Sequence, residues 1–263
     1  MQSCSNTIRK LDSIELLSIN LDGNSNKEVV YDISTNKKLI LKQQKTHKGI
    51  PYNDHIAEHL TCSILNECGF NTQETELVIY KRQLVVAITL KQEIKQLLQM
   101  KSYFNDGNKI VFDVGNIMAL AQSTKPAVDM TKFKEHLLDL ILISHVFCNK
   151  DLHPGNIGFV KSKTGVYIPS EIYDMAGSLL SLYAFDSKKR MKKELELSSS
   201  VKIFNKEYKV SDLIDNTKFN KLHSQLKTKQ PQIIKIIESL PEPYKEFGYE
   251  SYKMILRRSK MEV

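Results

Sequence analysis

The sequence predicts an α+β fold in two lobes, in which a β-rich first part precedes a helical second part. Short runs of β-branched and aliphatic residues, separated by turn residues, dominate the chain up to residue 90. From residue 91 onward, apolar residues recur mostly at helical spacing. A length of 263 residues suits one large domain or two packed lobes. We therefore expect a β-rich N-lobe at residues 1–90 and a helical C-lobe at residues 91–263.

The N-lobe is expected to hold a small sheet and one helix. Strands are predicted at 14–21, 29–33, 38–42, 77–80 and 84–88. The helix should begin after Asn53, because asparagine is a common capping residue. Its apolar positions Ile56, Leu60 and Ile64 recur at helical spacing, and Gly69 is a typical residue at a helix C-terminus.

The C-lobe is expected to be built around one long apolar helix. That helix is predicted at 130–148, and it leads directly into a tight loop at 149–156. Two short strands should follow at 157–160 and 171–173. Further helices are predicted at 189–197, 210–226, 231–240 and 243–257.

The charge and cysteine content favour a globular protein that folds without disulfides. The hydrophobic fraction is 41%, and the formal net charge is +8, from 38 Lys and Arg against 30 Asp and Glu. The basic residues are scattered rather than arranged in a stripe with aromatics, so direct nucleic-acid binding is not favoured. None of the four cysteines forms a C-x-x-C pair, which favours a reducing compartment.

No membrane span is expected, because the most apolar run, 137–148, is too short to cross a bilayer and contains Asp139 and His145. The first ten residues lack the apolar core of a signal peptide. We expect a cytoplasmic protein, or one exported without a cleaved signal peptide.

Three oxygen-bearing side chains around the loop carry the chemical prediction. Asp151 and Asn156 are five residues apart on a loop that Pro154 and Gly155 force to bend, so both side chains can face one pocket. Asp174 follows after a segment long enough for a hairpin that returns beside the loop. Phosphoryl transfer needs one carboxylate to orient the acceptor, and oxygen ligands for Mg²⁺. A lone D-x-H-x-x-N pattern is not specific, but its place after an apolar helix and before a Tyr-Asp strand end favours this function.

At the level of motifs, N-x-D-x-H-x-x-N-x-G-F followed by I-Y-D-x-x-x-S-L resembles the HipA-like serine/threonine kinases. The resemblance covers roughly residues 20–185. It implies a bilobal protein-kinase-like fold that uses ATP and Mg²⁺. By this resemblance Asp151 would be the catalytic base, and Asn156 and Asp174 would hold Mg²⁺. Lys42 would contact the ATP phosphates, with Glu58 as its ion-pair partner.

The same resemblance implies further nucleotide contacts in the N-lobe. Backbone groups near Ala87 and Thr89 would meet adenine, and the turn at 22–27 stands where the family covers the phosphates. This turn has one glycine rather than several, and Ser25 within it would be an autophosphorylated serine. On the predicted strand, Lys42 shares its face with Ile40, so that face should line the cleft.

Three functions remain open from the sequence. The first is a Ser/Thr protein kinase that also phosphorylates itself and acts as a toxin or secreted effector, with a protein substrate and an antitoxin or host-protein partner. The second is a small-molecule or lipid kinase, because D-L-H-x-x-N also resembles the loop of aminoglycoside and choline phosphotransferases. Those enzymes usually carry His where Asn149 stands. The third is a non-catalytic kinase-like binding module.

Overall fold

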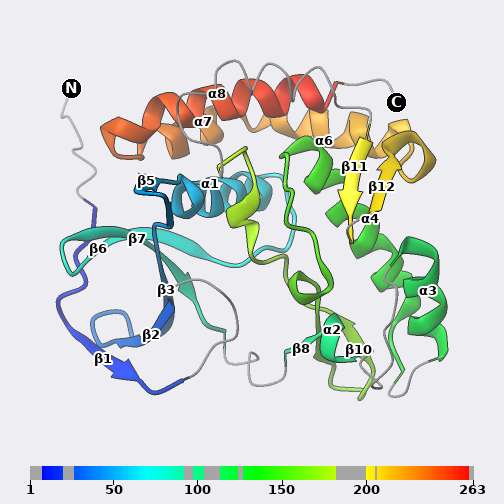
Figure 1. The fold of residues 1–263 in the computed structure, drawn as a ribbon, viewed down its shortest axis with the longest axis horizontal. Coiled ribbons are helices and arrows are strands. Elements are labelled where there is room, and N and C mark those ends of the chain that lie inside the picture. Colours follow the sequence, from blue (N-terminus) through cyan, green and yellow to red (C-terminus); the bar gives the residue numbers. More distant parts are fainter. Residues whose placement is uncertain are drawn as a thin grey trace.

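A five-stranded antiparallel sheet occupies the first part of the chain (Figure 1). The computed structural model describes residues 8–19, 27–91, 97–103, 113–123, 127–181, 200–204 and 206–260. Along the sheet the strands follow the order β1 (Ile14–Leu17), β2 (Lys27–Asp32), β3 (Lys37–Gln43), β7 (Gln83–Thr89) and β6 (Thr75–Tyr80). Each lies where the sequence predicts a strand, with its ends shifted by a few residues.

The two faces of this sheet differ in what covers them. Leu39 and Leu41 on β3 point into a small apolar cluster that also contains Val30, Val78 and Val85. Because successive side chains of a strand alternate between faces, Ile40 and Lys42 lie on the other side. That side is turned toward the following helix, with which β6 and β7 are in contact. Lys42 is therefore placed between the sheet and the helix.

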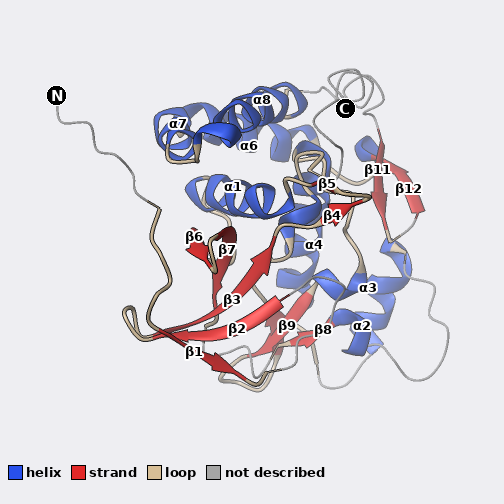
Figure 2. Ribbon diagram, turned by 60° about the vertical axis from the view of Figure 1, so that its left-hand side comes forward, coloured by secondary structure: helices blue, strands red, loops and turns tan. Residues whose placement is uncertain are grey.

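Helix α1 (Asp54–Glu67) is buried between the sheet and the C-terminal helices (Figure 2). Its neighbours on the far side are α7 (Gln230–Glu238) and α8 (Glu242–Arg258). Asn53 precedes α1 as predicted, but its side chain makes no capping hydrogen bond. The Asn53 N–H instead donates to the Ser181 carbonyl, 3.2 Å away, which ties the start of α1 to the second part of the chain.

The second part of the chain surrounds α4 (Met130–Val146), whose N-cap Asp129 accepts a hydrogen bond from the Lys132 N–H. Phe133 of α4 packs against Phe159, with ring centroids 5.3 Å apart. The other helices are α2 (Met100–Tyr103), α3 (Val114–Ser123) and α6 (Asn216–Thr228). A three-stranded sheet contains β10 (Tyr167–Pro169), β9 (Gly158–Lys161) and β8 (Leu98–Gln99).

Two short hairpins complete the described strands. One pairs β4 (Thr46–His47) with β5 (Ile50–Pro51), and the other pairs β11 (Ser200–Ile203) with β12 (Lys206–Lys209).

Several predicted elements differ from the observed ones. The prediction of a strand at 171–173 is wrong: this segment makes a single bridge, between Ile172 and Thr72, and β9 pairs with the earlier β10. The helix predicted from 210 begins at Asn216, where Asp215 caps it by accepting the Lys218 N–H. The predicted helix at 189–197 lies outside the described residues.

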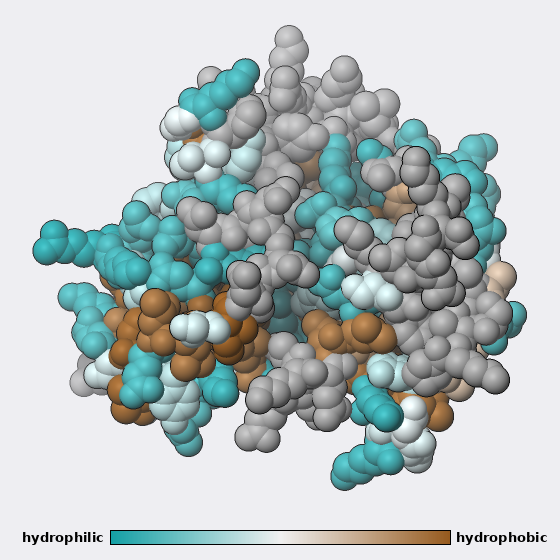
Figure 3. Space-filling view, turned by 60° about the horizontal axis from the view of Figure 1, so that its bottom comes forward, coloured by the Kyte–Doolittle hydropathy of each residue, from teal (hydrophilic) through white to brown (hydrophobic). Residues whose placement is uncertain are grey.

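None of the described helices is both long and apolar enough to cross a membrane. The three cysteines within the described residues, Cys62, Cys68 and Cys148, are buried and form no disulfide. Apolar side chains show on part of the surface, mainly on the side of the N-terminal sheet (Figure 3). The large apolar residues with the most exposed surface are Leu16, Ile19, Ile33 and Ile50.

Candidate active site

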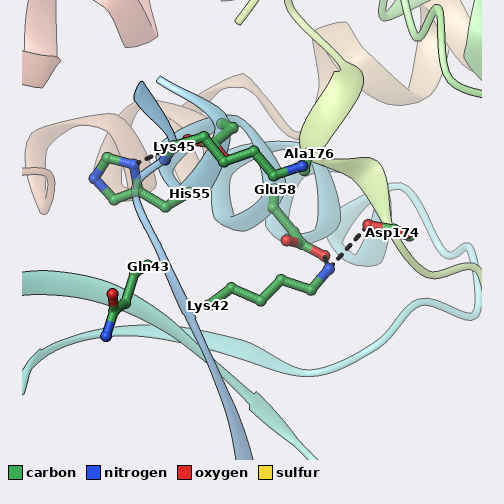
Figure 4. A pocket seen from close by; sticks show the side chains of 8 residues that line it. Lys42, Gln43, Lys45, His55, Glu58, Asp174 and Ala176 are labelled. Atoms are coloured by element: carbon green, nitrogen blue, oxygen red, sulfur yellow. Dashed lines mark hydrogen bonds and ion pairs between the residues drawn. The ribbon is translucent and has the colours of Figure 1, made fainter. Parts of the chain in front are cut away.

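Lys42, Glu58 and Asp174 meet in one ion-pair cluster, although they come from β3, α1 and the segment after Ile172 (Figure 4). Lys42 Nζ lies 2.6 Å from Glu58 Oε1 and 2.9 Å from Asp174 Oδ1. Lys42 is on the Ile40 face of β3, the face that the sequence assigned to the cleft. The structure therefore brings together three of the residues singled out from the sequence.

Glu58 is held from a second side by Gln73. The Gln73 Nε2 donates to Glu58 Oε1 at 2.7 Å, and the Gln73 N–H donates to the Ile172 carbonyl at 3.0 Å. The Glu58 side chain is fully buried, and its Oε2 has no hydrogen-bond partner among the described residues. A buried polar atom without a hydrogen bond lowers the stability of a protein, so Glu58 differs from an ordinary core residue.

Lys42 and Asp174 stabilise each other's charges, whereas burial raises the pKa of Glu58. Burial opposes the charge on Lys42, but the carboxylates of Glu58 and Asp174 outweigh that effect and raise the pKa of Lys42. Burial likewise opposes ionisation of Asp174, but the Lys42 ammonium outweighs it and lowers the pKa of Asp174. At neutral pH, Lys42 is therefore a cation and Asp174 an anion.

The loop at 149–156 is shaped by its own hydrogen bonds. The Asp151 N–H donates to Asn149 Oδ1 at 3.0 Å, and Asn156 Nδ2 donates to the Asp151 carbonyl at 2.8 Å. His153 caps the short 3₁₀ helix η2 (Pro154–Asn156) by accepting the Gly155 N–H at 3.0 Å. This hydrogen bond supports the loop. The His153 side chain is about half exposed, and its Nε2 lies 3.8 Å from Asp151 Oδ1.

The same loop is fastened to the segment that carries Asp174. The Tyr173 hydroxyl donates to the Gly155 carbonyl at 2.9 Å. Asp174 itself has a left-handed backbone, with φ 59° and ψ 52°, and it precedes the 3₁₀ helix η3 (Met175–Gly177). A Cβ on Gly177 would lie 2.8 Å from Asp151 Cβ, so only glycine allows this approach. Asp151 and Asp174 are therefore held on two adjoining segments.

Oxygen atoms suited to a hard cation remain open at this junction. Asn156 uses its Nδ2 in the loop, which leaves its Oδ1 available, and Lys42 pairs with only one oxygen of Asp174. No group of three or more His, Cys, Asp or Glu side chains within the described residues is arranged to hold a metal ion. Mg²⁺ commonly takes one or two protein ligands and completes its shell with phosphate oxygens and water. Asp174 and Asn156 fit that mode of binding.

The Asp151 carboxyl is exposed over about half of its side chain. Even so, the surrounding protein atoms raise its pKa by desolvation, His153 opposes that shift, and the charge of Asp174 adds to it. A carboxylate with a raised pKa is more basic than an ordinary aspartate, which suits a group that accepts a proton.

Some residues at the site were missed by the sequence analysis, and strand register is the signal that could have found them. Lys27 pairs with Lys42 across β2 and β3, so both lie on the cleft face. Burial and the charge of Lys42 lower the pKa of Lys27, while Asp174 opposes the shift. By the same register, Val29, Ile40 and Ile88 share this face and form its apolar part.

The remaining predicted contacts have a different outcome. Ala87 is fully buried in β7, with β3 and β6 on its two sides, and it belongs to the apolar cluster on the far face of the sheet. The Thr89 N–H donates to the Glu74 carbonyl at 3.0 Å. The Ala87 side chain therefore faces away from the cleft, whereas the predicted contact of backbone groups near Ala87 and Thr89 with adenine stays a prediction. Ser25 and the turn at 22–26 lie outside the described residues.

The fold and the site define a protein-kinase-like architecture. In a crystal structure, the Helicobacter pylori proinflammatory kinase CtkA matches 96% of this chain with 98% of its own, at a TM-score of 0.69 and 19% sequence identity. HipA from the Shewanella oneidensis MR-1 toxin–antitoxin complex with HipB and operator DNA matches 93% of the chain, at a TM-score of 0.51 and 13% identity. At these identities the matches establish the fold, and they confirm the predicted α+β kinase-like class.

The sequence also matches the model of the HipA-like C-terminal domain over residues 19–245. The chain belongs to this family, as the resemblance of its motifs had suggested. Among curated proteins it is similar to the serine/threonine-protein kinase CtkA of Helicobacter pylori (strain J99), with 29% identity over 141 residues. That alignment spans 51% of this chain and 43% of the relative.

Proposed function

We propose that this chain is an ATP- and Mg²⁺-dependent phosphotransferase, with lobes at 1–90 and 91–263 that hold the nucleotide between them. The observation that carries the proposal is the junction of Lys42, Glu58 and Asp174 with the adjoining loop of Asp151 and Asn156. A kinase-like binding module that had lost its activity would be expected to lack one of these groups, and all of them are present.

Each side chain then has a role that its surroundings support. When bound, Mg²⁺ would supply positive charge that neutralises the phosphates. Asn156 and Asp174 would hold it through side-chain oxygens, and Lys42, oriented by Glu58, would contact the phosphates. Asp151 would accept the proton of the acceptor hydroxyl as the acceptor oxygen bonds to phosphorus and the bond to ADP breaks. Val29, Ile40 and Ile88 would cover the adenine ring.

We further propose that the acceptor is a Ser or Thr hydroxyl of a protein, the chain itself included, with Ser25 as a candidate. The support is the family membership and the similarity to a relative described as a serine/threonine-protein kinase. A role as a toxin or secreted effector, with an antitoxin or host protein as partner, belongs to the same proposal. So does a cytoplasmic location, or export without a cleaved signal peptide.

The test is phosphate transfer from γ-labelled ATP with Mg²⁺ to the chain itself and to a generic protein such as casein. We expect labelling that falls at least about 1000-fold in Asp151→Ala, because the acceptor would lose its base. Asp212→Ala, which removes an exposed carboxylate in η4 (Val210–Asp212), is the matched control and should label as wild type. Turnover with choline, sugar or lipid acceptors but not with protein would replace the protein-kinase assignment. No turnover with any acceptor would refute the proposal.

A further inference from the structure

Lys45 lies three residues beyond Lys42, where the chain leaves β3 and enters the hairpin of β4 and β5. Its backbone is fixed at both ends: the Lys45 N–H donates to Asp54 Oδ1 at 3.1 Å, and its carbonyl accepts the Tyr52 N–H at 2.8 Å. Asp54 is buried at the start of α1. The position from which the Lys45 side chain projects is therefore as well defined as that of α1 itself.

The Lys45 side chain is directed into the candidate active site. It lines the same pocket as Lys42, Glu58, Asp174 and Ala176. In Figure 4 the end of the Lys45 side chain lies beside Ala176. Lys45 is an exposed residue, and its side chain contributes to the wall of this pocket.

The Lys45 ammonium has no ion pair or hydrogen bond with any described residue, although its charge acts on two acidic groups. It lowers the pKa of Asp151 and that of Asp174, in each case as a smaller contribution than the main causes given above. The cation thus acts on both carboxylates and lines a pocket with Asp174 without pairing with either of them. Its charge is therefore available to an anionic oxygen.

Phosphoryl transfer creates a need for such a cation. Charge in the transition state is spread over the three equatorial oxygens of the moving phosphoryl group, and cations aimed at it accelerate the reaction. The catalytic loop supplies no lysine or arginine between Asp151 and Asn156, where the residues are Leu152, His153, Pro154 and Gly155. Lys42 is already shared between Glu58 and Asp174.

We propose that Lys45 contacts the phosphoryl group during its transfer and stabilises the charge of the transition state. This inference rests on the proposed phosphotransferase function and adds one residue to its machinery. The distinguishing property is that Lys45 should act on turnover rather than on nucleotide affinity, because no bond holds its ammonium against the ground-state cluster.

The test is steady-state ATP turnover by the full chain for Lys45→Met, with Lys45→Arg as the conservative variant. We expect kcat to fall about 100-fold in Lys45→Met while the KM for ATP changes by less than about threefold. Lys45→Arg keeps the charge, so it should retain activity within about tenfold of wild type. Lys163→Met removes an exposed lysine from the turn between β9 and β10, and we expect it to behave as wild type.

The outcomes separate this inference from the function on which it rests. Absence of turnover in the wild-type chain would refute the phosphotransferase proposal itself. An active wild type with an unchanged kcat in Lys45→Met would overturn only the role of Lys45. A raised KM for ATP with unchanged kcat would also overturn it, because Lys45 would then bind the ground state and the transition state equally well. Thermal unfolding of each variant checks that it is folded. The inference would also fail if Lys45→Met had a lowered unfolding temperature and Lys45→Arg, which keeps the charge, were as inactive as Lys45→Met.

Discussion

Two ion-pair clusters lie on the same N-terminal sheet and differ in how completely their polar atoms are satisfied. In the first, Asp32 on β2 is 1% exposed and accepts bonds from Arg9, Thr35 and Ser34, which between them use both of its oxygens. Arg9 also pairs with Glu76 on β6. In the second, Lys42 joins Glu58 and Asp174, but Glu58 Oε2 has no partner among the described residues.

The difference separates a cluster that stabilises the fold from one arranged to receive a ligand. When both oxygens of a buried carboxylate are hydrogen-bonded, the charge-assisted hydrogen bonds offset the free-energy cost of its desolvation. An incompletely satisfied buried charge is tolerated mainly at sites where another molecule binds or reacts. Disruption of the first cluster should therefore lower stability without affecting turnover. Removal of both buried charges of the second cluster together should lower turnover without lowering stability.

The largest effect is expected from removing both buried charges of the second cluster with Lys42→Met and Glu58→Gln together. Turnover should fall about 1000-fold, because the phosphates lose their lysine. The free energy of unfolding should stay within about 1 kcal/mol of wild type, because the cost of burying these two charges disappears with them and Asp174, the third charge, is partly exposed. Urea unfolding and ATP turnover measure the two quantities.

The single variant Lys42→Met is the control for this experiment. It leaves Glu58 buried without its cation, so it should lose about 3 kcal/mol of stability that the double variant regains. If the double variant were as unstable as the single one, the second cluster would be a contributor to stability, and the contrast with Asp32 would not hold.

A smaller loss of turnover is expected from Gly177→Ala. The added Cβ would meet Asp151 Cβ at 2.8 Å and Asn149 Oδ1 at 3.1 Å, so the catalytic loop must shift. We expect kcat to fall about 100-fold through this displacement. Gly115→Ala in α3 meets only Asp113 Oδ1 at 3.5 Å and serves as the control, with unchanged kcat. Equal kcat values in the two variants would show that the approach of Gly177 to Asp151 is unimportant for activity.

The first cluster should respond in the opposite way. Asp32→Ala removes the acceptor of several partly buried hydrogen bonds and leaves Glu76 as the remaining ion-pair partner of Arg9, which should cost about 3 kcal/mol of unfolding free energy. Turnover should remain within about twofold of wild type below the unfolding transition. Glu76→Gln changes the more exposed partner of Arg9 and should cost less than about 1 kcal/mol. A large loss of turnover in folded Asp32→Ala would mean that this end of the sheet is coupled to the site.

The smallest effect is a pH dependence of the stability that the same cluster contributes. Burial opposes ionisation of Asp32, but the hydrogen bonds from Thr35, Ser34 and Arg9 outweigh it and lower its pKa to about 2. A depressed carboxyl pKa adds stability above the pKa of the unfolded chain, near 3.9, and that stability is lost as the pH falls toward 2. The stability difference between wild type and Asp32→Asn should thus shrink by about 1 kcal/mol between pH 5 and pH 3. A difference that stays constant over this range would contradict the assigned cause.

Local patterns in the sequence were sufficient to predict the elements that carry the site. The strand ending near Lys42, the helix with Glu58 and the loop at 149–156 all rest on short-range signals, namely alternation, helical spacing and turn residues. The segment at 171–173 was misjudged because a run of apolar and aromatic residues fits a strand, whereas here a single bridge to Thr72 replaces a ladder.

Contacts between distant segments were beyond these local patterns. The bond from Gln73 to Glu58 and the approach of Gly177 to Asp151 join residues whose proximity depends on the whole fold. The placement of Ala87 depends on β7 lying between β3 and β6, an order that hairpin signals do not specify. Once the register is known, strand geometry places Lys27, Val29 and Ile40 on the face of the sheet that lines the cleft.

The most direct measurement is a crystal structure of the chain with a non-hydrolysable ATP analogue and Mn²⁺, which reports the metal by its anomalous scattering. We expect a peak about 2.2 Å from side-chain oxygens of both Asp174 and Asn156, shared with phosphate oxygens of the analogue, with Asp151 facing the terminal phosphate. A metal bound elsewhere, or a nucleotide whose phosphates do not reach Lys42, would contradict the assignment of this junction as the catalytic centre.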